Sequence, residues 1–132
     1  MSSGYRRYDE VAIGDRFPET PARYAVTPEA IAAFRVATQD SAQSEFAPAL
    51  LAAVYGRPAQ NALKGPPGGV HAKQSFRFLQ PVKAGDVLET QLEVVDKYEK
   101  KGRRYLVSET VTRNQQGTLV TRGRITSIWG QE

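Results

Sequence analysis

The chain has 132 residues, enough to bury one hydrophobic core and too few for two, so we expect a single domain over residues 1–132. Apolar residues make up 40% of the sequence and charged residues 24%, which is typical of a globular protein and excludes disorder of the whole chain. There is no cysteine, so disulfide frameworks and thiolate zinc sites are excluded. The net charge of +4 is compatible with an anionic partner and also with ordinary surface composition.

The sequence shows no membrane span, secretory signal or metal motif. No stretch approaches the roughly 20 apolar residues that cross a bilayer, and residues 1–7 lack the apolar core of a signal peptide. The glycine-rich stretch Gly65–Gly69 lacks the Lys-Ser/Thr ending of a phosphate loop, and no zinc or calcium motif occurs. We therefore expect a cytoplasmic protein with no membrane contact, no metal and no bound cofactor.

The first clear element is a helix after residue 27. Thr27 is a good N-cap and Pro28 suits the first helical position, so the pattern predicts a helix from there to about Thr38, preceded by a short extended segment. Its buried stripe, at helical spacing, is expected to contain Ile31, Phe34 and Ala37 or Thr38.

An apolar run over residues 46–55 follows. Pro48 can occupy a first helical turn and Gly56 can end the helix, so this run predicts a helix of about two or three turns. The next interval, Arg57 to Gly69, contains prolines and glycines and has no sustained periodicity. It is expected to be a loop.

Beyond Gly69 the sequence changes to strand patterns. Apolar and polar residues alternate over four segments, residues 70–79, 87–95, 105–112 and 118–129. Long strands joined by short turns predict an antiparallel sheet, and the helices collected before them give an α+β layered arrangement. One sheet face must be covered by the helices, while the other face or the sheet edge is available for a partner.

Three segments together resemble the MaoC-like hot-dog family, which includes (R)-specific enoyl-CoA hydratases and bacterial (3R)-hydroxyacyl-carrier-protein dehydratase subunits. They are Tyr8–Asp15, Val26–Asp40 and Phe76–Asp86, the last with the Pro-x-x-x-Gly-Asp turn of the family. The resemblance implies a hot-dog fold, a long antiparallel sheet around a central helix. Only residues 46–55 could supply that helix, so we expect it to be short or missing.

The family carries its acid/base pair in the motif G-D-x-N-P-x-H after the first helix. Matched position by position, this chain has Gln39 for the glycine, Asp40 for the aspartate, Ala42-Gln43 for the Asn-Pro pair and Glu45 for the histidine. Hydration of a double bond needs two groups to handle the water proton and the carbon proton. The resemblance therefore implies a hot-dog fold that has lost part of its catalytic motif, like the non-catalytic half of a double hot-dog hydratase. Two alternatives stay open, a variant dyad of Asp40 with Glu45, and a purely structural role for both.

The single histidine, His71, lies at the predicted start of the first long strand. Its surroundings are similar to the His-Gly-Glu-Gln region of carrier-protein dehydratase subunits that lack the catalytic pair. The neighbouring Gly68, Gly69 and Val70 could bring backbone N–H groups close to a thioester carbonyl. His71 is thus a candidate catalytic residue, although a lone histidine at a strand start is more often structural or exposed than catalytic.

Basic residues crowd the stretch Lys97 to Arg104. Lys101 and Arg103 are candidates to bind the phosphates of a thioester or an acidic carrier protein, and a plain solvated turn is the alternative. No aromatic residues interleave as in stacking motifs for single strands, so nucleic acid is not an expected partner.

Three functions follow as hypotheses. The first is a non-catalytic or weakly catalytic subunit that binds acyl-CoA or acyl-carrier-protein thioesters and pairs with a catalytic hot-dog chain, in an (R)-specific enoyl-thioester hydratase or 3-hydroxyacyl dehydratase. The second is a self-sufficient homodimeric hydratase that uses Asp40 with His71 or Glu45. The third is an assembly module without a thioester ligand, in which the basic stretch binds an acidic protein.

Overall fold

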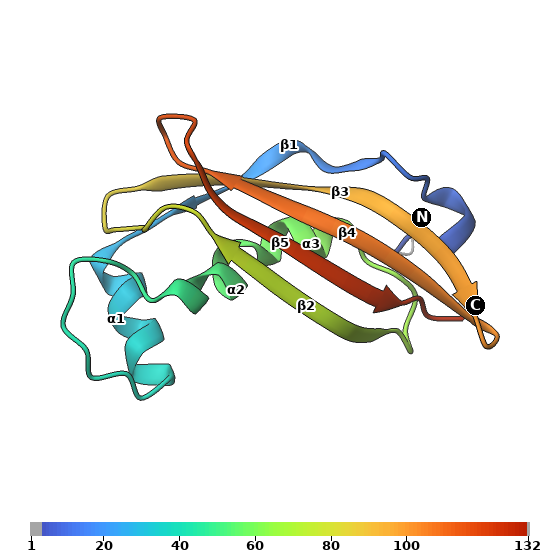
Figure 1. The fold of residues 1–132 in the computed structure, drawn as a ribbon, viewed down its shortest axis with the longest axis horizontal. Coiled ribbons are helices and arrows are strands. Elements are labelled where there is room, and N and C mark those ends of the chain that lie inside the picture. The colour runs from blue at the N-terminus through green and yellow to red at the C-terminus, as the bar shows by residue number, and fades with distance from the viewer. Residues whose placement is uncertain (1–3, 132) are drawn as a thin grey trace.

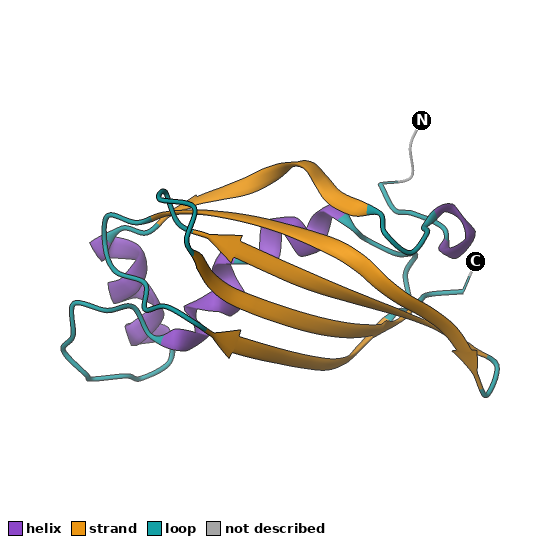
Figure 2. Cartoon of the chain, turned by 45° about the horizontal axis from the view of Figure 1, so that its top comes forward, coloured by secondary structure: helices purple, strands orange, loops and turns teal. Residues whose placement is uncertain are grey.

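A computed structural model describes residues 4–131; residues 1–3 of the N-terminal segment and residue 132 of the predicted domain lie outside the described residues. The elements in chain order are η1 (Tyr8–Glu10), β1 (Arg16–Ala25), α1 (Pro28–Ala37), η2 (Ala49–Leu51), α2 (Ala52–Tyr55), α3 (Arg57–Ala62), β2 (Val70–Phe78), β3 (Val87–Lys100), β4 (Arg103–Arg113) and β5 (Leu119–Ile128). The strands form one antiparallel sheet in the order β1-β3-β4-β5-β2. Helices α2 and α3 lie along one face of this sheet, and α1 lies beyond one end (Figures 1 and 2). The predicted α+β class is confirmed.

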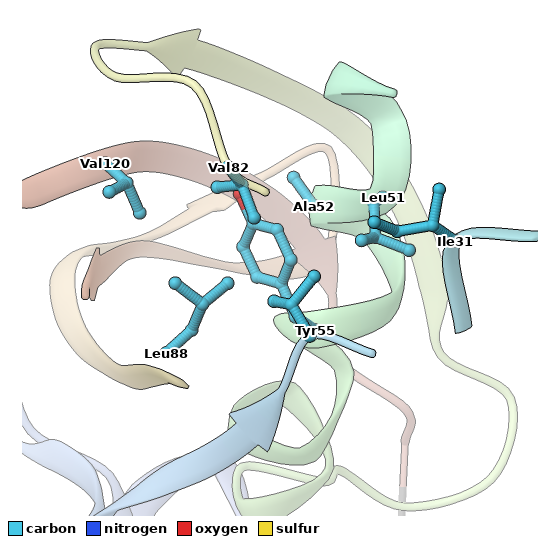
Figure 3. Packing of buried hydrophobic residues seen from close by; sticks show 8 residues of the cluster. Ile31, Leu51, Ala52, Tyr55, Val82, Leu88 and Val120 are labelled. Carbon is cyan, nitrogen blue, oxygen red and sulfur yellow. The ribbon is translucent and has the colours of Figure 1, made fainter. Parts of the chain in front are cut away.

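The face of the sheet toward α2 and α3, called the inner face here, carries the core. Along β3 the residues of one parity are buried, among them Leu88, Leu92 and Val94, as the alternation predicts. The larger cluster has the ring of Tyr55 at its centre (Figure 3). It comprises Val26, Ile31, Leu51, Ala52, Tyr55, Val82, Leu88 and Val120. A second cluster, at the other end of the sheet, comprises Tyr8, Val11, Leu63, Leu92, Val94, Leu106 and Trp129.

The strand β1 was not expected at this length. Its sequence contains Pro18 and Pro21, and its pairing with β3 is irregular between Phe17 and Ala22. Proline cannot donate to a ladder, but an edge strand can tolerate it on the side that faces away from the sheet. The prolines hide the strand from pattern reasoning and also protect this edge.

The prediction of a loop from Arg57 onward is wrong for its first half. Residues Arg57–Ala62 form α3, and Gly56 keeps right-handed helical dihedrals between α2 and α3. Backbone bonds from Gly56 to Ala52 and from Gln60 to Gly56, both 3.2 Å, connect the two pieces. A proline in the first turn of α3 interrupts the ladder without ending the helical run. The central helix is therefore short and segmented, over residues 49–62.

The first helix follows its predicted boundaries. The Thr27 side chain accepts a hydrogen bond from the backbone of Ala30 at 3.0 Å, which confirms the N-cap. Ile31 is buried and Phe34 is partly buried, as expected. Ala37 and Thr38 are exposed instead, because the last turn of α1 projects past the end of the sheet (Figure 1).

Candidate functional site

The loop after α1, where the family carries its acid/base pair, is held by an ion pair. A left-handed Gln39 (φ 56°) turns the chain, and Asp40 Oδ2 then lies 2.7 Å from Arg35 Nη1. Asp40 Oδ1 accepts a hydrogen bond from the backbone of Ala42 at 2.9 Å. The second guanidinium nitrogen of Arg35 donates to the carbonyl of Phe46 at 2.9 Å. Arg35 and Asp40 thus fasten both ends of this loop.

The three proposed acid/base residues do not meet within one chain. Glu45 is exposed on the loop after α1, which lies at the same end of the sheet as the C-terminal end of β2. His71 lies at the start of β2, near the opposite end (Figure 1). The seven residue-to-residue steps from His71 to Phe78 span roughly 23 Å of extended chain. Asp40 and His71 could reach a common substrate atom only across a subunit interface.

A cavity of about 790 Å³, called pocket 1 here, opens on the inner face at the His71 end of the sheet. Its floor consists of inward-facing residues of β3, β4 and β5, namely Leu92, Leu106, Ser108, Ile125 and Ser127. One wall is the last part of α3 with the segment that follows, and the opposite wall is the start of β2. Since the central helical run ends at Ala62, this half of the inner face is free of helix.

The glycine-rich stretch before β2 forms part of that wall. Gly68, Gly69 and Val70 all line pocket 1, together with His71. Gly68 has φ +91°, a conformation that side-chain-bearing residues rarely adopt. The stretch is also packed against Trp129, whose indole nitrogen donates to the carbonyl of Arg6 at 3.0 Å. Three of the predicted thioester contacts, Gly68, Gly69 and Val70, therefore line one cavity with His71, whereas Lys101 and Arg103 do not line it.

Several lining residues were not anticipated. Arg57 on α3 and Lys64 just after it are exposed at one side of pocket 1, in the interval where the sequence predicts an irregular loop. Ser108 and Ser127 lie on its floor, and strand alternation could have placed them on the inner face but could not reveal the cavity above them. Trp129 closes one side, and its position just after β5 gave no signal of a site.

The basic stretch divides into a structural part and an exposed tip. Lys97 donates to the carbonyls of Tyr8 (2.8 Å) and Val11, and its ammonium lies 4.1 Å from the centre of the Tyr8 ring. Arg104 is 3.4 Å from Glu99. Lys101 and Arg103 are exposed at the β3–β4 turn and do not line pocket 1. Lys97 fixes the N-terminal segment to the sheet, and Lys101 and Arg103 remain open to solvent.

A smaller cavity of about 310 Å³ lies near the other end of the sheet, between residues 47–49 and the end of β2. Tyr55 and Thr121 line it, and their hydroxyl groups hydrogen-bond each other. Burial raises the pKa of Tyr55, and the bond to Thr121 opposes part of that rise. Neither Asp40 nor Glu45 lines this cavity, so it is no substitute for the family's acid/base site.

Residues 4–131 contain neither a candidate metal centre nor a membrane-spanning helix. No group of three or more His, Asp or Glu side chains there could hold a metal ion. Within the same range, every helix is too short or too polar to cross a bilayer.

A long antiparallel sheet along a short central helix, with an open pocket on its inner face, defines the hot-dog class of fold. The chain belongs to the FAS1-like dehydratase domain region family, whose model matches residues 47–122. The match begins just after the loop that carries Asp40 and Glu45, and it contains the central helical run and the start of β2. No curated protein sequence matches the chain.

Solved structures share this fold at low sequence identity. The R-hydratase PhaJ1 of Pseudomonas aeruginosa superposes with a TM-score of 0.78 and 23% identity, covering 95% of this chain and 86% of that one. A MaoC-like dehydratase of Rhodospirillum rubrum superposes with a TM-score of 0.77 and 22% identity, covering 95% of this chain and 97% of that one. For the HadBC (3R)-hydroxyacyl-ACP dehydratase complex of Mycobacterium tuberculosis the TM-score is 0.69 and the identity 21%, over 88% of this chain and 96% of that one. The hot-dog fold expected from the sequence is thus confirmed.

Proposed function

We propose that this protein is a non-catalytic or weakly catalytic hot-dog subunit that binds the acyl part of a CoA or acyl-carrier-protein thioester in pocket 1. It would act in the cytoplasm beside a catalytic hot-dog chain that supplies the Asp and His, in (R)-specific hydration of enoyl thioesters or dehydration of 3-hydroxyacyl thioesters. This proposal rests on one observation: the cavity that can hold an acyl group, pocket 1, lies apart from the acid/base position Asp40. Pocket 1 is at the His71 end of the sheet, while Asp40 is fastened to Arg35 near the other end.

The size and lining of pocket 1 suit an acyl thioester. A cavity of about 790 Å³ is in the usual range for small-molecule sites. Apolar floor residues such as Leu92, Leu106 and Ile125 can bury an acyl chain, and the exposed Arg57 and Lys64 can attract phosphate groups at its mouth. Lys101 and Arg103, on the exposed turn, would act only as more distant contacts for an acidic carrier protein.

The partner chain would add to the edge of the sheet at β2. This strand ends the strand order, has no proline over nine residues and is exposed along most of its length. Such an edge offers unpaired N–H and C=O groups to another strand. Exposed apolar side chains flank it, including Phe78 (45% exposed) and Leu79 (42%). The HadBC structure is itself a complex of hot-dog chains, which supports assembly of this kind.

The decisive experiment measures binding and hydration on the same purified chain. Octanoyl-CoA should change the fluorescence of Trp129, the single tryptophan, which lines pocket 1. Crotonyl-CoA and longer trans-2-enoyl-CoAs should not be hydrated by the chain alone. Arg57→Glu and Lys64→Glu should weaken binding, and more so at low salt, whereas the matched Lys100→Glu, at an exposed residue that does not line pocket 1, should not. Robust hydration that Asp40→Ala abolishes would refute the non-catalytic role.

A second candidate, a homodimeric hydratase using Asp40 with His71, is favoured by one feature of the topology. Antiparallel pairing of two copies along β2 would place the start of one β2 beside the end of the other, and so bring His71 toward the second copy's loop after α1 (Figure 1). Mixing Asp40→Ala with His71→Ala subunits tests it. Half of the randomly mixed dimers would be heterodimers with one intact site of two, so recovery of about a quarter of the wild-type activity from two inactive parents would establish a shared site. Hydration that is absent in the wild type, the variants and the mixture would exclude it. If no thioester binds, the remaining hypothesis is an assembly module without a thioester ligand.

A further inference from the structure

The floor of pocket 1 contains a hydroxyl group with no hydrogen-bond partner among residues 4–131, that of Ser108. Ser108 is only 5% exposed, and it lines pocket 1 from the middle of β4. No fully buried side-chain polar atom of the described residues lacks a partner, so the unbonded Ser108 oxygen is open to the pocket. A ligand that covered this oxygen without bonding it would leave it unsatisfied, at a cost of about 1–3 kcal/mol. The hydroxyl of Ser108 is therefore available to a molecule in the pocket.

Several other hydroxyl groups of the inner face are bonded within the protein. Thr90 and Thr112 hydrogen-bond each other at 2.8 Å, and Thr121 bonds Tyr55. Ser108 differs from these pairs because it lines pocket 1 and has no such partner within residues 4–131.

A second set of polar groups adjoins Ser108 on the same floor. Ser127 faces pocket 1 from β5, and its register partner on β2 is His71. Residues paired across neighbouring strands have their Cβ atoms about 4.5–5.5 Å apart, so these two side chains can contact one ligand atom together. Neither makes a side-chain hydrogen bond within residues 4–131. The floor thus combines Leu106 and Ile125 with three free hydrogen-bonding groups.

Charge at the mouth of the pocket orients a thioester relative to this floor. Arg57 and Lys64 are exposed, whereas Ser108 is buried on a central strand. The phosphates of CoA or of a carrier's prosthetic group would remain with the cations at the mouth. The part of the ligand that reaches Ser108 is then the far end of the acyl group.

We propose that pocket 1 selects acyl groups that carry an oxygen substituent, a hydroxyl or keto group, near their far end. This specificity rests on the proposed thioester-binding function and goes beyond it. A plain alkyl tail would cover Ser108 and Ser127 without bonding them, which is the arrangement that costs most. An oxygenated tail bonds one or both hydroxyl groups and still packs its carbons on Leu106 and Ile125.

The test compares octanoyl-CoA with its positional hydroxyoctanoyl-CoA isomers, by calorimetry and by the fluorescence of Trp129. At least one isomer should bind the wild-type chain about two- to tenfold more tightly than octanoyl-CoA, the effect of one neutral hydrogen bond. Ser108→Ala should remove this preference and leave the affinity for octanoyl-CoA equal or higher. Ser127→Ala provides an independent variant if the first does not fold. Ser75→Ala, on the exposed β2 opposite Arg124 in the register, is the matched control and should change nothing.

The outcomes separate this specificity from the proposed function. If no thioester binds, the binding function fails. If all isomers bind no better than octanoyl-CoA, the binding function stands and the selection of an oxygenated tail is refuted. If Ser108→Ala weakens every thioester equally, Ser108 holds the common thioester carbonyl, and the selection is refuted as well.

Discussion

Trp129 lies against the backbone of Gly65 so closely that a methyl group at Gly65 would come within 2.7 Å of the indole ring. The contact joins the end of β5 to the segment between α3 and β2, and both contribute to the wall of pocket 1.

Gly65→Ala should therefore overpack this contact. We expect a loss of about 1–3 kcal/mol in the free energy of unfolding, measured by urea denaturation. The emission of Trp129 should also shift, because the ring must move away from the loop. Gln116→Ala, in the exposed β4–β5 turn, serves as the control and should leave both quantities unchanged. Unchanged stability and emission in Gly65→Ala would show that the loop moves freely.

Arg35→Ala should loosen the loop that carries Asp40. The variant loses the 2.7 Å ion pair and the bond to the Phe46 carbonyl, and Arg35 is mostly buried, so we expect about 1–3 kcal/mol of destabilisation. Hydrogen exchange should rise over residues 39–46. Binding of octanoyl-CoA should not change, because pocket 1 lies near the other end of the sheet. A parallel loss of binding would connect this loop to the pocket. The exposed Arg23 provides the matched Arg→Ala control.

Lys97→Met and Lys101→Met distinguish the two parts of the basic stretch. Lys97 bonds two carbonyls and contacts the Tyr8 ring, so its loss should cost about 2–4 kcal/mol, from two charge-assisted hydrogen bonds with partial compensation by water. Lys101 is exposed, and its replacement should stay within about 0.5 kcal/mol of wild type. Thermal melting of the two variants, compared with that of the wild type, tests this difference in stability. Equal effects would contradict the structural role of Lys97.

Alkaline pH should destabilise the fold through its buried tyrosines. Burial raises the pKa of Tyr55, and burial together with the nearby Glu99 raises that of Tyr8. Above about pH 10 the unfolded chain releases these protons while the folded chain keeps them, so stability is complete below that pH and falls as it rises through the folded pKa values. Tyr55→Phe should be less stable than wild type at pH 7, because Thr121 loses its partner. The difference should shrink at alkaline pH, and a constant difference up to pH 11 would contradict the role of Tyr55.

The sequence was informative where local chemistry and periodicity agree. Thr27 caps α1 because its side chain and the following Pro28 suit a helix start regardless of the rest of the fold. The four strands from β2 to β5 could be predicted because their alternation reflects one buried face. The strand β1 and the helix α3 were missed because proline disfavours both structures in isolation, and tertiary context permits them at an edge and in a first turn.

The site was less predictable, because it depends on distances between separate elements. Gly68, Gly69 and His71 could be selected from their neighbourhood, and they do line one cavity. The ion pair of Asp40 with Arg35 depends on a left-handed turn at Gln39, which no propensity indicates. The opening of the pocket above the Ser108 hydroxyl depends on where the central helical run stops. Alternation can place a serine on a face, but it cannot show that the space above it is empty.

The two edges of the sheet are unlike, since β1 contains two prolines while β2 contains none and is exposed along most of its length. A chain with one open sheet edge can add one neighbour by strand pairing along β2. The outer edge of that neighbour is then its own β1, where the prolines disfavour further strand pairing. Growth therefore stops at a closed pair, related by a two-fold axis if the chains are identical. The prolines of β1 thus limit polymerisation into fibres, a hazard that a sheet with two open borders would carry.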